Sequence, residues 1–171
     1  MSELAAGVSI RPATTGDIRS IRDLIDPLVV SRVLLGKERV MLYEAVQEFM
    51  VAVNGDEVVG CGALHVFWEN LGEVRTLAVA EGHTGHGIGS ALLDALEQKA
   101  SDLGLSQLFC LTFEVDFFSH HGFVHVEEPI VDPEVYVELV RSPDEGVAEF
   151  LDLARVKSNT LGNSRMVKNL T

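Results

Sequence analysis

The chain has 171 residues, 47% of them hydrophobic, which is long enough for one domain with a complete core. Asp and Glu number 26 against 13 Lys and Arg, so the formal net charge is −13. This charge argues against nucleic acid and anionic membrane as partners, because both are bound through clustered Lys and Arg. No apolar run is long enough to cross a bilayer and the N-terminus lacks a signal pattern, so we expect a single cytoplasmic domain over residues 1–171.

The N-terminal part of the chain predicts a strand followed by a helix. Val8–Arg11 indicates a short strand, and Thr14 or Thr15 can cap a helix that carries the apolar residues of 18–28. Pro27 lacks a backbone donor, so we expect it to kink or end this helix.

Residues 31–39 form a looser stretch that holds Arg32, Lys37 and Arg39 in an otherwise acidic chain. A solvated bend and a carboxylate-binding loop both explain such a basic cluster, and the residues alone leave the choice open. Residues 40–46 are predicted to form a second short helix.

A hairpin is predicted next, with strands over 48–53 and 57–67. The dipeptide Asn54-Gly55 between them is a strong signal for a tight hairpin turn. Gly60 and Gly62 inside the second strand indicate a bulge or a close approach of the backbone to another group. Cys61 lies between these glycines; it and Cys110, the two cysteines of the chain, are interpreted as reduced core thiols.

The most informative stretch is 71–93. Its first half is predicted to be a strand with Val74, Thr76 and Ala78 on one face and Arg75, Leu77 and Val79 on the other. A turn and the glycine-rich segment Gly85–Gly89 follow, and a long helix starts at once. A bare loop before a helix N-terminus directs several N–H groups at one spot, which suits a phosphate or pyrophosphate group.

Three phosphate-binding patterns can be compared with this loop. A nucleotide P-loop requires Lys-Ser/Thr after its last glycine, where this chain has Ser-Ala. A dinucleotide fingerprint requires G-x-G-x-x-G, and the glycine spacing here differs. The third pattern is Arg or Gln, two residues, Gly, one residue, and Gly or Ala; Gly87 and Gly89 match it, but Thr84 occupies its first position. A glycine-rich turn without a ligand is the alternative.

The second half of the chain completes a mixed α/β pattern. Gly104 should end the long helix, and the apolar run 107–113 indicates a strand that is covered on both faces. The further elements expected are a short helix (114–121), a strand (123–126), a helix that starts at Asp132-Pro133, and a variable tail (147–166). Antiparallel strands therefore come first and a βαβ unit follows. The six histidines include no pair with zinc spacing, so no metal is expected.

This element order and the glycine loop resemble the GCN5-related N-acetyltransferase (GNAT) family over nearly the whole chain. The segment Phe-Phe-Ser-His-His-Gly-Phe, residues 117–123, is similar to a second family segment, Phe-Tyr-x₃-Gly-Phe. The resemblance implies an α/β (α+β) fold whose mixed, mostly antiparallel sheet splays at its central strands and carries helices on both faces, with acetyl-CoA as the acetyl donor. Many members have a Tyr at the position of Phe118 that protonates the leaving thiolate. We expect Phe118 to pack instead, and the general acid stays open between Thr112, Ser119 and water.

A narrower resemblance points to the bacterial N-acetylglutamate synthases, in their short, single-domain form. It rests on segments 42–49, 60–64, 72–74, 108–112 and 161–166. These enzymes acetylate the α-amino group of glutamate, and in some members of glutamine, as the first step of arginine biosynthesis. The long form has an additional amino-acid-kinase-like domain that senses arginine, and we do not expect that domain here.

The resemblance also implies residues for the chemistry. Glu73, at the start of the central strand, is the candidate general base, with a solvated strand-end carboxylate as the alternative. A backbone N–H of Leu77 or Val79 should stabilise the oxyanion. The coenzyme contacts implied in this way are Leu77, Ala78, Val79, Thr84, Gly85, His86, Gly87, Ile88, Gly89 and Ser90.

An amino-acid substrate brings carboxylate groups, which need cations or N–H donors. Lys37 lies in the region that binds the substrate carboxylate in the synthases, Arg75 lies on the central strand, and Arg165 follows Ser164 in the C-terminal segment. Backbone groups at Cys61 complete the predicted substrate site. For each cation the alternative is an ordinary surface charge.

Two other functions stay open. The acidic composition would also suit an acetyltransferase for a protein N-terminus, a lysine or a drug. The missing Tyr would suit a non-catalytic acyl-CoA sensor, although Glu73 argues against this. By analogy with the fold, the C-terminal strands could pair across a homodimer.

Overall fold

Residues 4–31, 33–34, 38–128, 131–151 and 163–170 are described by the computed structural model of the chain. The strands are β1 (Val8–Pro12), β2 (Phe49–Asn54), β3 (Glu57–Val66), β4 (Leu71–Val79), β5 (Gln107–Thr112), β6 (Val124–His125) and β7 (Ser164–Asn169). The helices are α1 (Ile18–Val30), α2 (Arg39–Glu44), α3 (Ile88–Asp102), α4 (Val115–His120), α5 (Pro133–Leu139) and α6 (Glu145–Phe150), with short 3₁₀ turns η1 (Thr15–Asp17) and η2 (Val46–Glu48).

Within the described residues the strands form one sheet in the order β1-β2-β3-β4-β5-β7-β6. Neighbouring strands are antiparallel except β4 and β5, which are parallel and are connected by the crossover helix α3. The predicted α/β class, the antiparallel start and the βαβ unit are confirmed.

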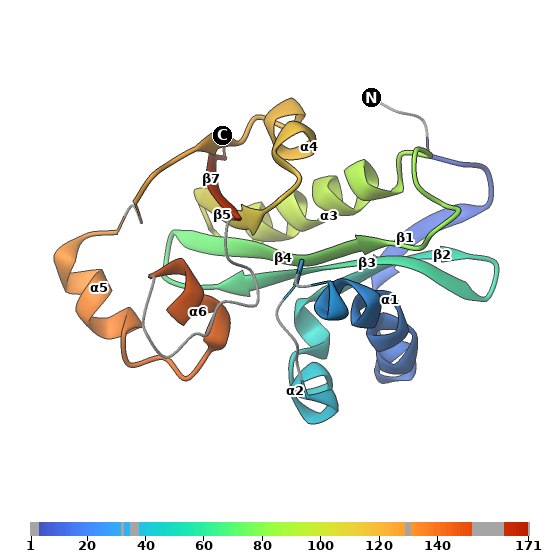
Figure 1. Cartoon of the computed structure of the whole chain (residues 1–171), viewed down its shortest axis with the longest axis horizontal. Helices are drawn as coiled ribbons and strands as arrows, with labels where there is room; N and C mark the ends of the chain where they lie inside the picture. Colours follow the sequence, from blue (N-terminus) through green and yellow to red (C-terminus); the bar gives the residue numbers. More distant parts are fainter. Residues whose placement is uncertain (1–3, 32, 35–37, 129–130, 152–162, 171) are drawn as a thin grey trace.

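Helices cover both faces of the sheet (Figure 1). On one face, Leu93 and Leu96 of α3 and Phe118 of α4 pack with Val74 of β4 and Leu108 of β5. On the opposite face, α1 and α2 cover β2 and β3, while α5 and α6 cover β5 and β7. The central strand β4 lies under both layers, and so its polar side chains are buried.

Gly60 and Gly62 allow α3 to lie close to the sheet. A Cβ at Gly60 would lie 3.0 Å from side-chain atoms of Ile88 and Leu92, and a Cβ at Gly62 would lie 2.9 Å from Leu96. The strand pairing also changes register beside both glycines. Both explanations predicted for these residues, a bulge and a close approach, are therefore confirmed.

A β-bulge interrupts β4 at Thr76. Cys61 is opposite Ala78 while Ala63 is opposite Arg75, so β4 has one residue more than β3 at this point. Thr76 has a φ of 57°, a left-handed conformation that is unfavourable for a β-branched residue and costs roughly 1–3 kcal/mol. The Cys61 thiol donates a hydrogen bond to the Thr76 carbonyl (Sγ–O 3.4 Å), which fixes the bulge to β3.

The bulge changes the face on which the side chains of β4 lie. Leu77 packs with Val74 against α3, whereas Ala78 packs against α1 and Arg75 contacts Asp144 beside α6. The predicted alternation, which placed Arg75 and Leu77 on one face and Val74 and Ala78 on the other, is therefore wrong beyond Arg75. The extra residue shifts the period-two pattern by one position.

β4 and β5 separate after a short paired section. Leu71, Gly72 and Glu73 pair with Gln107, Leu108 and Phe109. Beyond this point β4 continues to Val79 and β5 to Thr112, but the two strands no longer pair with each other. The sheet therefore opens next to Glu73, which is the splay expected for this fold.

Helix α1 differs from its prediction. It continues through Pro27 to Val30, so of the two predicted outcomes, a kink or an end of the helix at Pro27, the second is wrong. Pro27 and Asp23, whose carbonyl would normally accept from residue 27, are both exposed. Water can therefore satisfy that carbonyl, and the proline is tolerated near the helix end.

Two elements near the C-terminus were not predicted. β7 lies between β5 and β6 and pairs with both. α6 is capped by Asp144, whose carboxylate accepts from the Val147 amide at 2.9 Å. The segment expected to be a variable tail thus supplies an internal strand and a helix that packs on Phe109.

The start of α1 is held by Asp17. Its carboxylate accepts from the Thr14 backbone amide at 2.7 Å. Thr14, one of the two caps predicted, is the N-cap of the 3₁₀ turn η1 that leads into α1, whereas Asp17 is the N-cap of α1 itself. Arg11 donates two more hydrogen bonds to the Asp17 carboxylate, at 2.7 and 3.0 Å. The hydrogen bonds from Arg11 lower the pKa of Asp17 to about 2.

Asp17→Asn should lower the free energy of unfolding at pH 7 by about 1–2 kcal/mol, because charge-assisted hydrogen bonds are lost. Since the folded-state pKa is depressed, this contribution is present above the ordinary Asp pKa of 3.8 and is lost as the pH falls toward about 2. Urea unfolding of both proteins between pH 7 and pH 3 measures the difference, with Asp23→Asn on the exposed face of α1 as the control. Equal stability at pH 7 would contradict the assignment.

Candidate functional site

The segment between β4 and α3 is an open loop. Gly85 and Gly87 have φ values of 78° and 76°, a region that favours glycine. A Cβ at Gly82 or Gly85 would meet no atom within 4 Å. The backbone is therefore accessible at these positions, and the first-turn amides of α3 have no acceptor within the helix. Loop and helix together are suited to bind an anion.

The unpaired edge of β4 adds further donors. The Ala80 amide donates to the Val59 carbonyl of β3 at 2.8 Å. Because amide directions alternate along a strand, the N–H groups of Val79 and Leu77 point away from β3, toward the edge that β5 leaves unpaired. These are the two amides expected to stabilise an oxyanion, and their orientation agrees with that role, which stays a prediction.

Residues 77–79 and 84–90, the predicted coenzyme contacts, form a continuous path from the end of β4 to the first turn of α3. Thr84, Gly85 and His86 are exposed. Ala78 and Ile88 are buried in the core, so only their backbone groups can face a ligand. The contacts with coenzyme stay predictions.

Helix α4 supports the beginning of α3. His121 Nε2 lies 3.1 Å from Ser90 Oγ, and the Phe117 ring lies 3.4 Å from the position of a Cβ at Gly89. Phe118 is 4% exposed and packs edge-on against Phe117, so its expected packing role is confirmed. Phe117 of α4 and His121 directly after it therefore pack against the first turn of α3.

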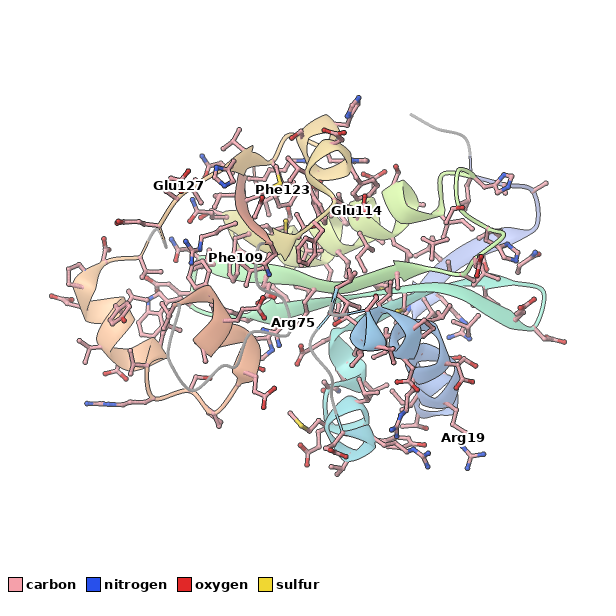
Figure 2. The ribbon with its side chains drawn as sticks, viewed as in Figure 1. Arg19, Arg75, Phe109, Glu114, Phe123 and Glu127 are labelled. Carbon is pink, nitrogen blue, oxygen red and sulfur yellow. The ribbon has the colours of Figure 1, made fainter. Side chains whose placement is uncertain are left out.

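Glu73 is the last residue of β4 that pairs with β5, and it is only 5% exposed. Arg75 Nη2 donates to Glu73 Oε2 at 2.9 Å. The same nitrogen donates to Asp144 Oδ2 at 2.9 Å, and Nη1 donates to Asp144 Oδ1 at 3.0 Å. Arg75, which Figure 2 shows beside the sheet and next to α6, thus joins a carboxylate of β4 to the cap of α6.

The two carboxylates have different proton affinities. Burial raises the pKa of Glu73 to about 6, and the charge of Arg75 limits the rise. Burial acts on Asp144 as well, but the hydrogen bonds and charge of Arg75 outweigh it and hold the pKa of Asp144 below its ordinary value. Asp144 therefore stays ionised, whereas Glu73 can take up and release a proton near neutral pH, as a general base must.

His65 of β3 extends the cluster. It is the strand partner of Glu73; its Nδ1 lies 2.9 Å from Glu48 Oε1 and its Nε2 lies 3.9 Å from Asp144 Oδ2. His65, Glu48 and Asp144 were not identified from the sequence as parts of the site. Asp144 had one usable signal, since it follows Pro143 and precedes apolar residues at helical spacing.

Of the three cations expected to bind the substrate, Arg75 and Arg165 are bonded to groups of the chain itself. Arg75 is bonded to Glu73 and Asp144, and its Nε is buried without a partner among the described residues. Arg165 is 8% exposed and donates to two backbone carbonyls at 2.7 Å each. Lys37 lies outside the described residues. Their roles as carboxylate ligands stay predictions.

The other two predicted substrate contacts lie on strands. Ser164 begins β7 opposite Thr112, and Cys61 has no exposed surface. Burial raises the pKa of the Cys61 thiol to about 12, so the thiol is protonated and can donate to Thr76. Contact between Cys61 and a substrate would use its backbone and stays a prediction.

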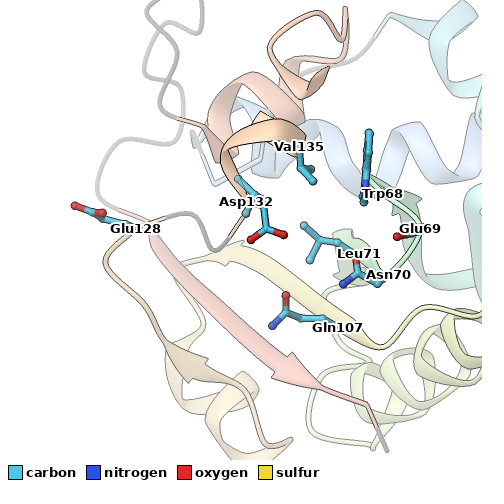
Figure 3. Close-up of a pocket in the computed structure, with 9 residues that line it drawn as sticks. Trp68, Glu69, Asn70, Leu71, Gln107, Glu128, Asp132 and Val135 are labelled. Atoms are coloured by element: carbon cyan, nitrogen blue, oxygen red, sulfur yellow. The ribbon is translucent and has the colours of Figure 1, made fainter. Parts of the chain in front are cut away.

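The described residues contain no group of three or more His, Cys, Asp or Glu that could hold a metal ion. In the same part of the chain no helix has both the length and the hydrophobicity to cross a membrane. A pocket of about 570 Å³ lies at the other end of β4 and β5, between Trp68, Leu71, Gln107 and Asp132 (Figure 3). Neither Glu73 nor the glycine loop lines it, so it is separate from the site above.

Comparison with known proteins agrees with this geometry. Residues 21–123 match the family described as "Acetyltransferase (GNAT) family". The amino-acid acetyltransferase of Mycobacterium tuberculosis H37Rv is 55% identical over 161 residues, which cover 92% of each chain. The crystal structure of Rv2747 from M. tuberculosis in complex with CoA and NLQ has a TM-score of 0.91 at 54% identity, and the match covers 95% of this chain and 99% of that one.

A third relative is the N-acetylglutamate synthase of Neisseria gonorrhoeae, whose structure contains coenzyme A and N-acetyl-glutamate. It has a TM-score of 0.78 at 29% identity; the match covers 98% of this chain but 36% of the synthase. The chain therefore belongs to the GNAT family, and it is an acetyl-CoA-dependent N-acetyltransferase. The family resemblance inferred from the glycine loop and residues 117–123 is confirmed.

Gly87→Val should raise the KM for acetyl-CoA by at least about 10-fold, equivalent to about 1.4 kcal/mol of binding, and should leave the KM for the amino acid nearly unchanged. The reason is that a side chain at φ 76° strains the loop that presents the amides to the diphosphate. Steady-state kinetics with each substrate varied in turn measures both constants.

Gly104→Val is the matched control, because Gly104 also has a positive φ but lies at the far end of α3, where an added Cβ would meet no atom within 4 Å. If Gly87→Val and Gly104→Val give the same KM for acetyl-CoA, the loop does not bind the diphosphate.

Proposed function

We propose that the protein transfers the acetyl group of acetyl-CoA to the α-amino group of L-glutamate or L-glutamine, the first step of arginine biosynthesis. The observation that carries this proposal is the position of Glu73. It is a buried carboxylate with a raised pKa, at the point where β4 and β5 separate, on the strand that leads into the open glycine loop. The named relatives support the substrate class.

In this mechanism Glu73 removes a proton from the substrate ammonium group, directly or through one water. The neutral amine then attacks the thioester carbon, and a tetrahedral oxyanion forms. The N–H groups of Val79 and Leu77 on the unpaired edge of β4 stabilise the negative oxygen. Backbone amides of 85–90 bind the coenzyme diphosphate and hold the thioester in place.

Collapse of the intermediate breaks the C–S bond; the nitrogen loses the extra proton it carried after the attack, and the leaving thiolate takes up a proton, so that a neutral amide and a thiol are formed. Thr112 is one candidate donor, because its Oγ1 already accepts from the Glu114 amide at 2.8 Å and its own hydrogen is left for another acceptor. Ser119 and water are the alternatives. Phe118 has no proton to give.

Two further features belong to the same proposal. A cytoplasmic location is supported by two buried cysteines, Cys61 and Cys110, that are not bonded to each other. A homodimer through the C-terminal strands is supported by analogy with the fold. In the described sheet β7 is internal, so β6 would be the strand available for such pairing.

A second candidate substrate is a cationic amine, such as a lysine or a protein N-terminus, which the net charge of −13 favours. A thiol-release assay with acetyl-CoA across the twenty amino acids and a lysine peptide separates the two. Release with glutamate or glutamine at least about 10-fold above the other amines supports the proposal. Selective release with the peptide, or acetyl-CoA binding with no release on any amine, would contradict it.

Glu73→Gln should lower kcat by about 10²–10⁴-fold and leave the KM for acetyl-CoA within about 2-fold, because the general base is lost while the loop is untouched. In the wild type, kcat/KM should fall as the pH drops through about 6, since protonated Glu73 cannot accept a proton. This acid limb should be absent in Glu73→Gln.

Glu69→Gln, an exposed carboxylate before β4, is the matched control and should retain both the rate and the acid limb. Turnover of Glu73→Gln within a few-fold of the wild type would show that another group acts as the base.

A further inference from the structure

Asp144 and Glu73 are far apart in the sequence, but both accept hydrogen bonds from the guanidinium of Arg75. The two hydrogen bonds between Arg75 and Asp144 connect residues 69 positions apart, and both are partly buried. Asp144 takes Nη1 and Nη2 of Arg75, whereas Glu73 receives one hydrogen bond, from Nη2 to Oε2. Among the described residues, Arg75 is the hydrogen-bond partner of the Glu73 carboxylate. It donates one hydrogen bond to that carboxylate, so the interaction is not bidentate.

The local structure of α6 keeps the guanidinium in this place. A Cβ at Gly146 would lie 2.6 Å from Arg75 Nη2 and 2.9 Å from Arg75 Cζ, so any larger residue there would displace the guanidinium from the first turn of the helix. Asp144 is itself fixed, because its Oδ2 also accepts from the Val147 amide. The Phe67 ring, 5.9 Å from Arg75 Cζ, closes another side of the guanidinium.

We propose that Asp144 is a positioning residue for the general base: it holds Arg75 so that only one oxygen of Glu73 is engaged and the other stays available to the substrate amine or its water. This inference rests on the proposed function, and it assigns Arg75 to the base in place of the substrate role expected from the sequence. Asp144, in the segment directly before α6, then influences the reaction through Arg75. Without Asp144, the guanidinium would be able to turn its fork onto Glu73 and occupy both oxygens.

The charges around Glu73 give the direction of the effect. Arg75 on β4 favours the ionised carboxylate, while Asp144 and Glu149 from the α6 segment disfavour it. The neighbouring charged or titratable groups on other elements are His65 on β3, Glu48 on η2 and Cys110 on β5. Loss of the Asp144 charge removes one negative neighbour and strengthens the hold of Arg75, so both changes lower the pKa of Glu73.

Asp144→Asn is the first variant, because Asn retains an oxygen that can cap α6 and loses the charge. The acid limb of kcat/KM should move down by about 1 pH unit, and kcat on the plateau should fall about 10-fold, since the base is weaker and more occupied. Arg75→Met should move the limb in the opposite direction, to higher pH. A purely structural role for Asp144 would not produce shifts of opposite sign.

Asp132→Asn is the matched control, because Asp132 is the N-cap of the neighbouring helix α5 and does not contact Arg75. It should leave the pH profile unchanged. Asp144→Ser, which also retains a capping oxygen, should repeat the result of Asp144→Asn. Urea unfolding and the KM for acetyl-CoA identify any variant that has lost its fold.

A ¹³C NMR titration of the Glu73 carboxyl, assigned with Glu73→Gln, tests the inference without any turnover. A lower Glu73 pKa in Asp144→Asn and a higher one in Arg75→Met support it. An unchanged Glu73 pKa in a folded Asp144→Asn or Asp144→Ser protein overturns it. Absence of thiol release in the wild type would instead overturn the proposed function, and the titration would still report on Asp144.

Discussion

The separation of β4 from β5 after Glu73 is the constraint on which the site depends. Three residue pairs hold the strands together, and beyond them the amides of β4 have no strand partner on that side. The extra residue at Thr76 lets β4 change direction, and α3 stays packed on the sheet because Gly60 and Gly62 leave room for it. An opening in the middle of the sheet is thereby stabilised by close packing on either side of it.

The charged groups at this opening are the side chains of Glu73 and Arg75, which are buried, and of Asp144, which is half-buried. Two carboxylates share one guanidinium, and their surroundings set them apart: Asp144 is kept ionised, and Glu73 has its pKa raised to about 6. Isolated buried charges are costly, so the cluster holds only because every carboxylate has a cationic or hydrogen-bonding neighbour. The free-energy cost of burying these charges arises at the place where a proton has to be transferred, which is common at catalytic sites.

The parts of the site predicted from the sequence are those with a local signal. The glycine loop lies within one stretch, and the hairpin turn at Asn54-Gly55 and the helix end at Gly104 follow from single residues with defined backbone preferences, whereas Glu73 was implied by the family resemblance. Most of the sheet could be predicted because the strands carry either apolar alternation or, as in 107–113, a continuous apolar run. The family resemblance added the position of the splay.

The parts that were missed depend on contacts between distant residues. Nothing in the sequence around Thr76 signals a left-handed residue, so the faces of β4 were assigned wrongly beyond Arg75. Asp144 contacts Arg75 across 69 residues of sequence, and β7 lies between β5 and β6, so neither arrangement has a local signal. Arg75 and Arg165 were predicted to bind the substrate carboxylates, with an ordinary surface charge as the alternative; both are buried and bonded within the chain.

A crystal structure with coenzyme A and the amino-acid substrate bound together would test the central claim most directly. The coenzyme should pass between the separated ends of β4 and β5 with its diphosphate on the amides of 85–90, and the substrate nitrogen should lie within about 3.2 Å of Glu73 or of one water bound to it. A coenzyme bound elsewhere, for example in the pocket beside Trp68, or a substrate nitrogen remote from Glu73, would contradict it.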